Sequence, residues 1–267
     1  VSPSALNRSV QGFEEELGLP VFDRVPGGVR LTTAGELLLD LLDRHLTAFD
    51  DLRTQLVNLR EGLSGTLRLT CGSDIGAGLV LTAVREFEDA FPGVSVDLAV
   101  ADSAVAVQRR EVDLAVLTNP ETDDTLEVVH AARIPLCAWQ AAGVGTPPAD
   151  LSELVGRRLL LPPETTGSRV AISHVLRRHR LTTGTVSTIT AAQLREQLAD
   201  SPRVAIFPAT VCVGTVWHDG PLRLAFGFGD VQLCVLRAAR VPMIRPAQAF
   251  MTVLQRRLDL AAIPRPA

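Results

Sequence analysis

Short apolar runs and amphipathic segments alternate regularly through residues 67–117, and this alternation constrains the fold more than any other feature of the chain. Runs typical of strands and segments typical of helices follow one another in the order Leu67–Cys71, Leu79–Phe91, Val94–Val100, Ala104–Arg110 and Asp113–Leu117. Because each helix returns the chain to the edge at which the previous strand began, the strands of such a series run parallel. The sequence therefore predicts an α/β fold.

The same alternation resumes near Arg158. Strand-like and helix-like segments follow in the order Leu159–Leu161, Ser168–Arg180, Val186–Ile189, Ala191–Ala199 and Val204–Phe207. A further strand is predicted at Val231–Arg237 and a last helix at Pro246–Leu260. Two stretches with one rhythm predict two α/β lobes, with a ligand cleft between them at the carboxyl ends of the strands.

The start of the chain follows a different pattern. Ser2 and Pro3 are typical of a helix start and Gly18 of a helix end, which predicts a helix over residues 3–17. Its apolar residues recur at three- and four-residue spacing and form a face that we expect to be packed, namely Leu6, Val10, Phe13 and Leu17. Two short strand-like runs then flank a turn around residues 26–28, which predicts a β-wing after the helix.

Residues 33–63 contain no proline and predict one long helix. Positions that alternate in steps of four and three form a heptad seam, which consists of Leu38, Leu42, His45, Phe49, Leu52, Leu56, Leu59 and Leu63. At 1.5 Å per residue this helix would run for roughly 40 Å. A helix from a second copy is the natural cover for such a seam. We interpret His45 as a solvated seam residue rather than as a pH-sensitive pairing device.

The composition excludes several classes of function. The chain carries 26 basic residues against 30 acidic ones, so a contact with nucleic acid must come from a local element. Every basic residue is Arg, which excludes Walker-A phosphate sites, Schiff-base chemistry and kinase-type catalysis, because these need a lysine amine. The apolar runs are shorter than the ~20 residues that span a bilayer, so we expect no contact with a membrane.

The cysteines and the first residues predict a cytoplasmic protein. Cys71, Cys137, Cys212 and Cys234 are widely separated and are interpreted as free thiols in a reducing compartment. Residues 1–18 carry charges and contain no apolar core of a secretory signal, although a chain that opens with Val is not necessarily complete.

Several motifs together resemble the LysR-type transcriptional regulators. In the first segment the matching residues are Phe13–Gly18, Pro20–Arg24 and Val29–Gly35. The match continues, in the order found in the family, through Gly65–Leu69, Phe91–Val94, Val112–Val116 and Val204–Pro208. The resemblance covers nearly the whole chain. Its first segment is highly specific as a combination, whereas the later motifs are persuasive mainly by their order.

The resemblance implies a cytoplasmic regulator of transcription that responds to a ligand. It implies a partial winged helix-turn-helix over residues 1–35, a dimerising linker helix over 36–63 and an effector domain like the periplasmic binding proteins over 64–267. Lobe one would comprise residues 65–138 and 240–262, and lobe two residues 141–237, with crossings near Cys137–Ala141 and Arg237–Val241. The expected partners are double-stranded DNA, a small-molecule effector, and further copies in a homodimer or homotetramer formed through the linker helix.

The chain opens where the recognition helix of the family opens. We expect a fragment or a misplaced start, rather than a regulator that has lost DNA binding. Asn7 and Gln11 are suited to adenine edges and Arg8 to guanine or phosphate, whereas Ser4, Arg24 and Arg30 suit phosphate or minor-groove contact. The alternative is an ordinary solvated helix face.

The candidate effector-binding residues follow predicted strands or precede a predicted helix, and they are Ser73, Asp74, Thr118, Asn119, Thr165, Thr166, Ser168, Thr190 and Pro208. Hydroxyl and N–H groups at the helix start near Ser168 form an anion site, which favours a carboxylate-bearing effector. Asp74 would repel a bare anion, which points weakly to an amino-acid-like or hydroxylated ligand. Helix capping is the alternative role for Ser73, Asp74 and Ser168.

Other motifs predict neither a cofactor nor a metal. Residues 76–78 lack the third glycine of a dinucleotide fingerprint, and His174 and His179 do not share a helix face. Cys212 and Cys234 are interpreted as inert thiols rather than as a redox pair. We predict that the protein is not an enzyme. The alternatives are a stand-alone two-lobed small-molecule binding protein without DNA binding and an α/β enzyme.

Overall fold

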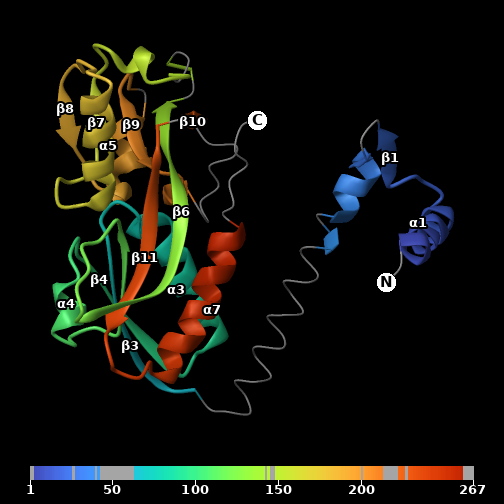
Figure 1. The fold of residues 1–267 in the computed structure, drawn as a ribbon, viewed down its shortest axis with the longest axis horizontal. Coiled ribbons are helices and arrows are strands. Elements are labelled where there is room, and N and C mark those ends of the chain that lie inside the picture. Colours follow the sequence, from blue (N-terminus) through green and yellow to red (C-terminus); the bar gives the residue numbers. More distant parts are fainter. Residues whose placement is uncertain are drawn as a thin grey trace. The chain divides into compact units, whose positions relative to one another are not determined.

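The computed structural model describes residues 3–25, 28–39, 41–42, 63–141, 143–144, 148–199, 201–212, 222–225 and 228–260. The chain forms two compact units, Val1–Gly62 and Leu63–Ala267 (Figure 1). The finer division into residues 1–35, 36–63 and 64–267 stays a prediction.

The N-terminal unit contains a helix followed by a two-stranded wing. Helix α1 (Pro3–Leu17) precedes strands β1 (Phe22–Val25) and β2 (Gly28–Leu31), which pair in antiparallel register with Phe22 opposite Leu31. This confirms the predicted helix and wing. A further helix begins at Thr33 and is described to residue 42 except at residue 40. The predicted seam from His45 to Leu59 lies outside the described residues.

Glu14 holds the wing against the end of α1. Its Oε1 accepts hydrogen bonds from the backbone N–H groups of Val21, at 2.7 Å, and Phe22, at 3.0 Å. The helix from Thr33 approaches the wing closely, because a Cβ at Gly35 would overlap the Val21 carbonyl oxygen. The described residues do not cover the apolar face of α1 as predicted, since Phe13 and Leu17 remain exposed. Val21 is buried instead, close to Gly35 of the helix from Thr33.

The larger unit begins with three parallel strands. Strand β3 (Gly65–Cys71) lies between β4 (Val94–Val100) and β5 (Leu114–Thr118) and pairs with both in parallel register. This confirms the βαβαβ order predicted from the alternation. The segments between the strands are shorter or more divided than predicted, and they form a π-helical turn η1 (Gly76–Val80), helix α3 (Leu81–Ala90) and helix α4 (Val105–Gln108).

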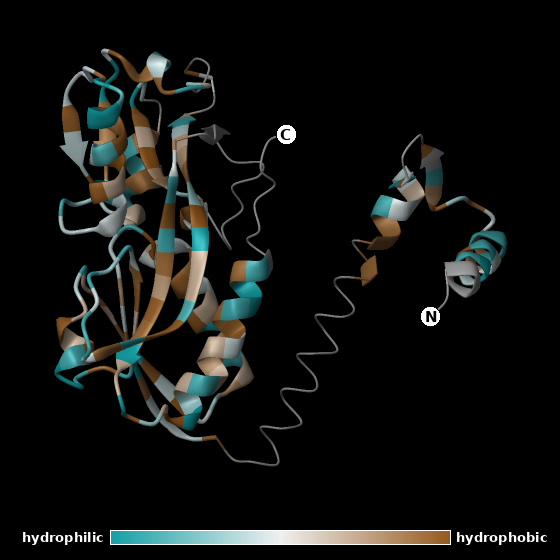
Figure 2. Ribbon diagram, in the orientation of Figure 1, coloured by the Kyte–Doolittle hydropathy of each residue, from teal (hydrophilic) through white to brown (hydrophobic). Residues whose placement is uncertain are grey.

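The second set of parallel strands forms lobe two. Strand β7 (Leu159–Leu161) lies between β8 (Val186–Thr188) and β9 (Val204–Pro208). The helical elements of this part are η2 (Ser152–Leu154), α5 (Gly167–Arg178), η3 (Ala191–Gln193), α6 (Leu194–Leu198) and η4 (Ala209–Cys212). Figure 2 shows β7 and β9 largely in the hydrophobic colour, as expected for strands that are buried on both faces.

Two long antiparallel strands join the lobes. Strand β6 (Leu126–Ala141) pairs with β11 (Asp230–Ala238) up to Pro135 and then with β9 from Leu136. The short strand β10 (Leu222–Ala225) also pairs with β6. The described strands of this unit form one connected sheet in the order β4-β3-β5-β11-β6-β9-β7-β8, with β10 outside this order, and Figure 1 shows β6 and β11 running side by side along it.

The crossings near Cys137–Ala141 and Arg237–Val241 stay predictions. Strand β6 exchanges β11 for β9 as its partner at Pro135 and Leu136, just before the first predicted crossing. Strand β11 pairs with β5 over Leu233–Leu236, just before the second predicted crossing. A single strand that serves both lobes needs no loop at the crossing.

The last helix packs on lobe one. Helix α7 (Arg245–Leu260) contacts α3 through Phe250 and Phe87, whose ring centroids lie 5.6 Å apart in an edge-to-face arrangement. Arg256 and Arg257 of α7 form ion pairs with Glu86 of α3. These contacts fix the final helix beside the strands that carry the candidate site.

Candidate functional site

A pocket of about 520 Å³ lies where the carboxyl ends of β3, β4 and β5 meet the start of α5. Residues after each of these strands and residues at the start of α5 line it, namely Gly72, Asp74, Asp102, Ser103, Ala104, Val105, Gln108, Leu117, Thr118, Asn119, Pro120, Glu121, Thr122, Asp123, Thr165, Thr166, Gly167 and Val170. Its volume is that of a site for a small metabolite. The carboxyl edge of a parallel sheet is where such sites form.

Asp74 belongs to the lining of this pocket and is fully buried. Its Oδ2 accepts a hydrogen bond of 2.6 Å from the hydroxyl of Thr118, and the same hydroxyl oxygen accepts the N–H of Ser168 at 3.0 Å. Burial raises the pKa of the Asp74 carboxyl, while hydrogen bonds from Ser168 and Thr118 oppose that rise. Its other oxygen, Oδ1, is buried without a hydrogen-bond partner.

Asp102 connects the two lobes. Its Oδ1 accepts the backbone N–H of Ser73 at 2.7 Å, and its Oδ2 accepts the Ser73 hydroxyl at 3.0 Å. The hydroxyl of Thr165, from lobe two, donates to the same Oδ2 at 2.6 Å. Asp102 therefore holds the turn after β3 and the turn before α5 together.

Backbone groups of the two lobes also meet directly. The N–H of Ala191 in lobe two donates to the carbonyl oxygen of Ser73 at 2.8 Å. Gly167 lies so close to the end of β5 that a Cβ at this position would overlap the carbonyl oxygen of Thr118. The lobes are thus in contact beside the pocket, and a glycine is required at the point of closest approach.

The charge of the pocket is negative. Four carboxylates line it, contributed by Asp74, Asp102, Glu121 and Asp123, and the described lining contains no Arg or His. Hydrogen bonds from the hydroxyl and the N–H of Thr125 lower the pKa of the Asp123 carboxyl. Asp123 is therefore ionised at neutral pH.

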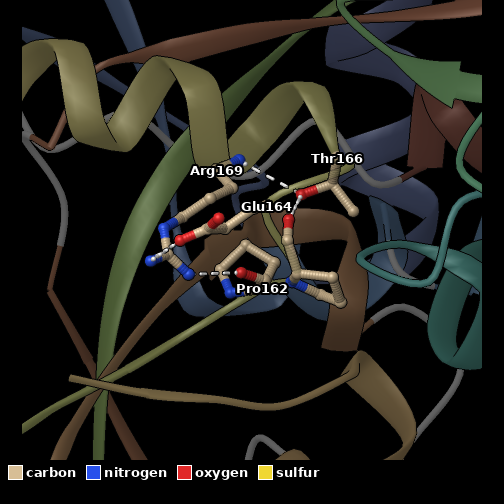
Figure 3. Close-up of polar contacts among 5 residues, drawn as sticks. Pro162, Glu164, Thr166 and Arg169 are labelled. Carbon is tan, nitrogen blue, oxygen red and sulfur yellow. Dashed lines mark hydrogen bonds and ion pairs between the residues drawn. The ribbon is translucent and has the colours of Figure 1, made fainter.

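Arg169 lies in the first turn of α5, but it does not belong to the lining of the pocket. Its guanidinium donates to the carbonyl oxygen of Pro162 at 2.8 Å and forms an ion pair of 3.4 Å with Glu164 (Figure 3). Its backbone N–H donates to the hydroxyl of Thr166, which caps the helix. Arg169 therefore balances a carboxylate outside the pocket.

Five of the nine predicted effector-binding residues line the pocket, and they are Asp74, Thr118, Asn119, Thr165 and Thr166. Ser73 and Ser168 lie beside it and take part in the hydrogen bonds between the lobes. Thr190 forms a capping box with Gln193, and Pro208 is buried at the end of β9. Neither of these two is among the described residues of the lining, and the binding role of all nine stays a prediction.

Capping was the alternative role for Ser73, Asp74 and Ser168, but the N-cap of α5 is Thr166, and the N-cap of η1 is Ile75. Thr166 accepts the N–H of Arg169 at 3.2 Å, which is the geometry of an N-cap. Asn119 also has a structural role, since its Oδ1 accepts the N–H of Gln232 at 2.7 Å. Prediction from the sequence missed Asp102, Gln108, Glu121 and Asp123. A signal for Asp102 was present, because it follows the predicted strand Val94–Val100.

The candidate DNA-binding residues lie on α1 and the wing. Asn7, Arg8 and Gln11 are exposed on α1, and Arg30 is exposed on β2. The side chains of Ser4 and Arg24 lie outside what the structure describes, although the backbone of Arg24 pairs with Val29. Asn7 and Gln11 are four residues apart and therefore share one face of the helix.

The described cysteines are buried thiols. Burial raises the pKa of Cys71 and that of Cys137 to about 12, and it also raises the pKa of Cys234. The side chain of Cys212 lies outside what the structure describes. That Cys212 and Cys234 are inert thiols and not a redox pair therefore stays a prediction. Among the described residues, His, Cys, Asp and Glu side chains do not form a group that could hold a metal ion.

Within the part of the chain that the structure describes, every helix is too short or too polar to cross a membrane.

Comparisons with known proteins match both units. Residues 60–259 match the family described as LysR substrate binding domain, and residues 1–36 match the family described as bacterial regulatory helix-turn-helix protein, lysR family. The HTH-type transcriptional activator IlvY of Salmonella typhimurium is 35% identical over 125 residues, which are 46% of this chain and 42% of the activator. The chain thus matches less than half the length of that relative.

Two solved structures share the fold. The Synechocystis PCC6803 CcmR regulatory domain in complex with 2-PG has a TM-score of 0.60 at 17% identity, over 72% of this chain and 97% of that domain. Full-length CbnR complexed with its target DNA has a TM-score of 0.57 at 19% identity, over 96% of this chain and 90% of CbnR.

Proposed function

Because this chain belongs to the LysR family of bacterial regulators, we propose that it controls transcription by binding DNA with its N-terminal unit and a small-molecule effector in the pocket beside Asp74. The observation that carries the proposal is the pocket of about 520 Å³ at the carboxyl ends of β3, β4 and β5, inside the region that matches the substrate-binding domain. The protein would act in the cytoplasm, as a regulator and not as an enzyme.

The DNA-binding part of the proposal rests on the exposed polar face of α1. Asn7 and Gln11 would read adenine edges, and Arg8 would contact guanine or phosphate. Arg30 of the wing, together with Ser4 and Arg24, would contact the backbone or the minor groove. The CbnR structure with target DNA supports this use of the fold, because it aligns with nearly the whole chain.

The effector part rests on the polar residues shared between the lobes. Ligand groups that enter the pocket meet Asp74, Thr118 and Asn119 of lobe one and Thr165 and Thr166 of lobe two. The CcmR regulatory domain, which shares this fold, was solved with a small molecule bound. An effector acts only through different affinities for the arrangements of the lobes, so contacts with both lobes are what regulation requires.

The proposed assembly is a homodimer or homotetramer formed through the helix over residues 36–63. In the described part of that helix, Leu42 of the predicted seam is exposed and Leu38 is half-buried, and Leu37, Leu39 and Leu41 beside them are exposed too. Neighbouring exposed leucines favour a partner surface that covers them. Sedimentation equilibrium of the purified protein tests this part, and a monomer at high concentration would refute it.

DNase footprinting of the native protein on DNA that flanks its own gene tests the DNA-binding proposal. We expect protection at low salt. Arg8→Ala should weaken it by about fivefold or more if Arg8 meets a base, since a bidentate contact contributes about 1–3 kcal/mol. Arg109→Ala, an exposed arginine of the larger unit, is the matched control and should leave the footprint unchanged. Absence of any footprint for the native protein would refute the proposal.

A further inference from the structure

We propose that the effector is an organic cation, a small molecule that carries an ammonium or guanidinium group, which Asp102, Glu121 and Asp74 recognise. This inference rests on the proposed function, because it takes the pocket as the effector site. It opposes the carboxylate-bearing effector expected from the sequence.

In the described part of the chain, the acidic side chains around the pocket are not balanced by basic ones. Four carboxylates belong to the lining, and the described residues of the lining supply no cation to balance them. Arg169 is already paired with Glu164 outside the pocket. Without Asp74, the lining still contains the acidic side chains of Asp102, Glu121 and Asp123. A concave site lined by one sign of charge concentrates ligands of the opposite sign.

Two of the N–H groups at the start of α5 are already hydrogen-bonded within the protein. The N–H of Ser168 donates to the Thr118 hydroxyl, and the N–H of Arg169 donates to the Thr166 hydroxyl. The sequence-based expectation of a carboxylate site required these groups to face a ligand. The remaining effect of the helix is its dipole, equivalent to roughly half an elementary charge, which several carboxylates outweigh.

One oxygen of the Asp74 carboxyl has no hydrogen-bond partner among the described residues. Its Oδ1 is fully buried, it has no hydrogen-bond partner, and the residue belongs to the pocket lining. A buried acceptor without a donor is costly, and an N–H donor from a ligand would satisfy it. An ammonium or guanidinium group supplies such donors together with the opposite charge.

A metal ion fits the same residues less well. Among the described residues, the acidic side chains of the pocket are not grouped closely enough to form one metal site. Carboxylates that are spread over the walls suit a molecule that carries several donors along its length.

Isothermal titration with a series of four-carbon compounds tests the inference. The probes are 1,4-diaminobutane, 4-aminobutyrate, butane-1,4-diol and succinate, which differ mainly in charge. We expect the diamine to bind most tightly, 4-aminobutyrate to bind more weakly, and the diol and succinate not to bind at millimolar concentration. Added salt should weaken binding of the diamine, because the attraction is electrostatic.

Variants locate the binding. Asp102→Asn and Glu121→Gln should each weaken binding of the diamine about fivefold, as expected for partly exposed charge pairs. Asp89→Asn and Glu88→Gln are the matched controls, because both side chains are exposed on α3 outside the pocket. The controls should bind the diamine as the unchanged protein does.

Two results would overturn the inference. The first is that succinate binds at least as tightly as the diamine. If Asp102→Asn then altered the binding of succinate, the pocket would still be the effector site, and only the proposed charge of the ligand would be wrong. The second is failure of the diamine to bind at millimolar concentration, or binding that Asp102→Asn and Glu121→Gln leave unchanged. Tight diamine binding without any DNA footprint would instead refute the proposed function and leave the ligand class supported.

Discussion

The hydroxyl of Thr165 donates a hydrogen bond of 2.6 Å to Oδ2 of Asp102, and this contact joins lobe two to lobe one at the edge of the pocket. Asp102 is held in place by the N–H and the hydroxyl of Ser73. Because the Asp102 carboxylate already binds both lobes, a ligand that pairs with it would also change the hydrogen bonds between the lobes.

Thr165→Val removes this contact while keeping the shape of the side chain. Because Thr165 is exposed and water can replace the lost donor, we expect a loss of at most about 1 kcal/mol in the free energy of unfolding. The lobes should separate more often, which hydrogen exchange of the amides of Ser73 and Ala191 would detect as faster exchange. Thr182→Val, at an exposed threonine away from the pocket, is the control. Equal exchange in both variants would contradict the prediction.

Gly167→Ala should prevent the closest approach of the lobes. A Cβ at this position overlaps the carbonyl oxygen of Thr118, which is backbone and cannot move aside as a side chain would. We expect a loss of about 1–3 kcal/mol in the free energy of unfolding, as for other overpacked sites. Small-angle scattering should show a larger radius of gyration for the effector unit.

Gly12→Ala is the matched control for this change. A Cβ at Gly12 meets nothing within 4 Å, and alanine is favoured over glycine within a helix such as α1. This variant should be neutral or slightly stabilising. A similar loss of stability in both variants would show that the effect at Gly167 does not come from Thr118.

The parallel strands could be predicted from the sequence because each is a short apolar run between amphipathic segments. Strand β4 was predicted with its observed bounds. Strand β6 was missed, since it contains Glu127, His130, Arg133 and Pro135, residues that are rare in the interior of a sheet. The charged residues Glu127 and Arg133 fit in this strand because they form ion pairs with Arg237 and Asp230 of the neighbouring strand β11. Such long-range compensation is invisible to a local pattern.

The pocket could be predicted only in part. Thr118 and Asp74 follow strands that the sequence identifies, and the rule that ligands bind at the carboxyl ends of strands located them. The same rule selected Thr190 and Pro208, but neither is among the described residues of the lining, and Thr190 instead forms a capping box with Gln193. The negative charge was missed because Glu121 and Asp123 lie in a loop that only the fold brings beside Asp102.

The buried carboxyl of Asp74 should make stability depend on pH. Its folded-state pKa is raised above the ordinary value of 3.8, so the folded state holds the proton more firmly than the unfolded state. The stability that this proton contributes is fully present below pH 3.8 and is lost as the pH rises to the folded-state pKa.

Asp74→Asn removes that dependence and keeps an oxygen that can accept the Thr118 hydroxyl. Measured by thermal unfolding, the variant should gain stability relative to the unchanged protein as the pH rises from about 4 towards neutrality. A difference between the two proteins that stays constant across this range would contradict the raised pKa.

The buried thiols should be unreactive in the folded protein. With a pKa of about 12, Cys71 and Cys137 are almost entirely in the thiol form at neutral pH, and only the thiolate reacts with iodoacetamide. We expect these two residues and Cys234 to remain unlabelled in native protein and to be labelled completely in denaturant, as read from peptide masses. Native labelling at the rate of a free cysteine would contradict the burial of that residue.

Glu14 should be essential for the position of the wing. Its Oε1 accepts two backbone N–H groups, from Val21 and Phe22, and Glu14→Ala would leave both without this acceptor. We expect a loss of about 1–3 kcal/mol in the local stability of the wing, because hydrogen bonds to charged groups are stronger than neutral ones. Hydrogen exchange at these two amides measures the loss directly.

Glu16→Ala is the matched control, since Glu16 is an exposed residue of the same helix turn. It should leave the amides of Val21 and Phe22 as protected as before. Because the wing carries Arg30, Glu14→Ala should also weaken the proposed DNA footprint, whereas Glu16→Ala, which removes a negative charge near the DNA, should leave it unchanged or strengthen it. Equal losses of protection in the two variants would mean that charge alone, and not the contact with Val21 and Phe22, positions the wing.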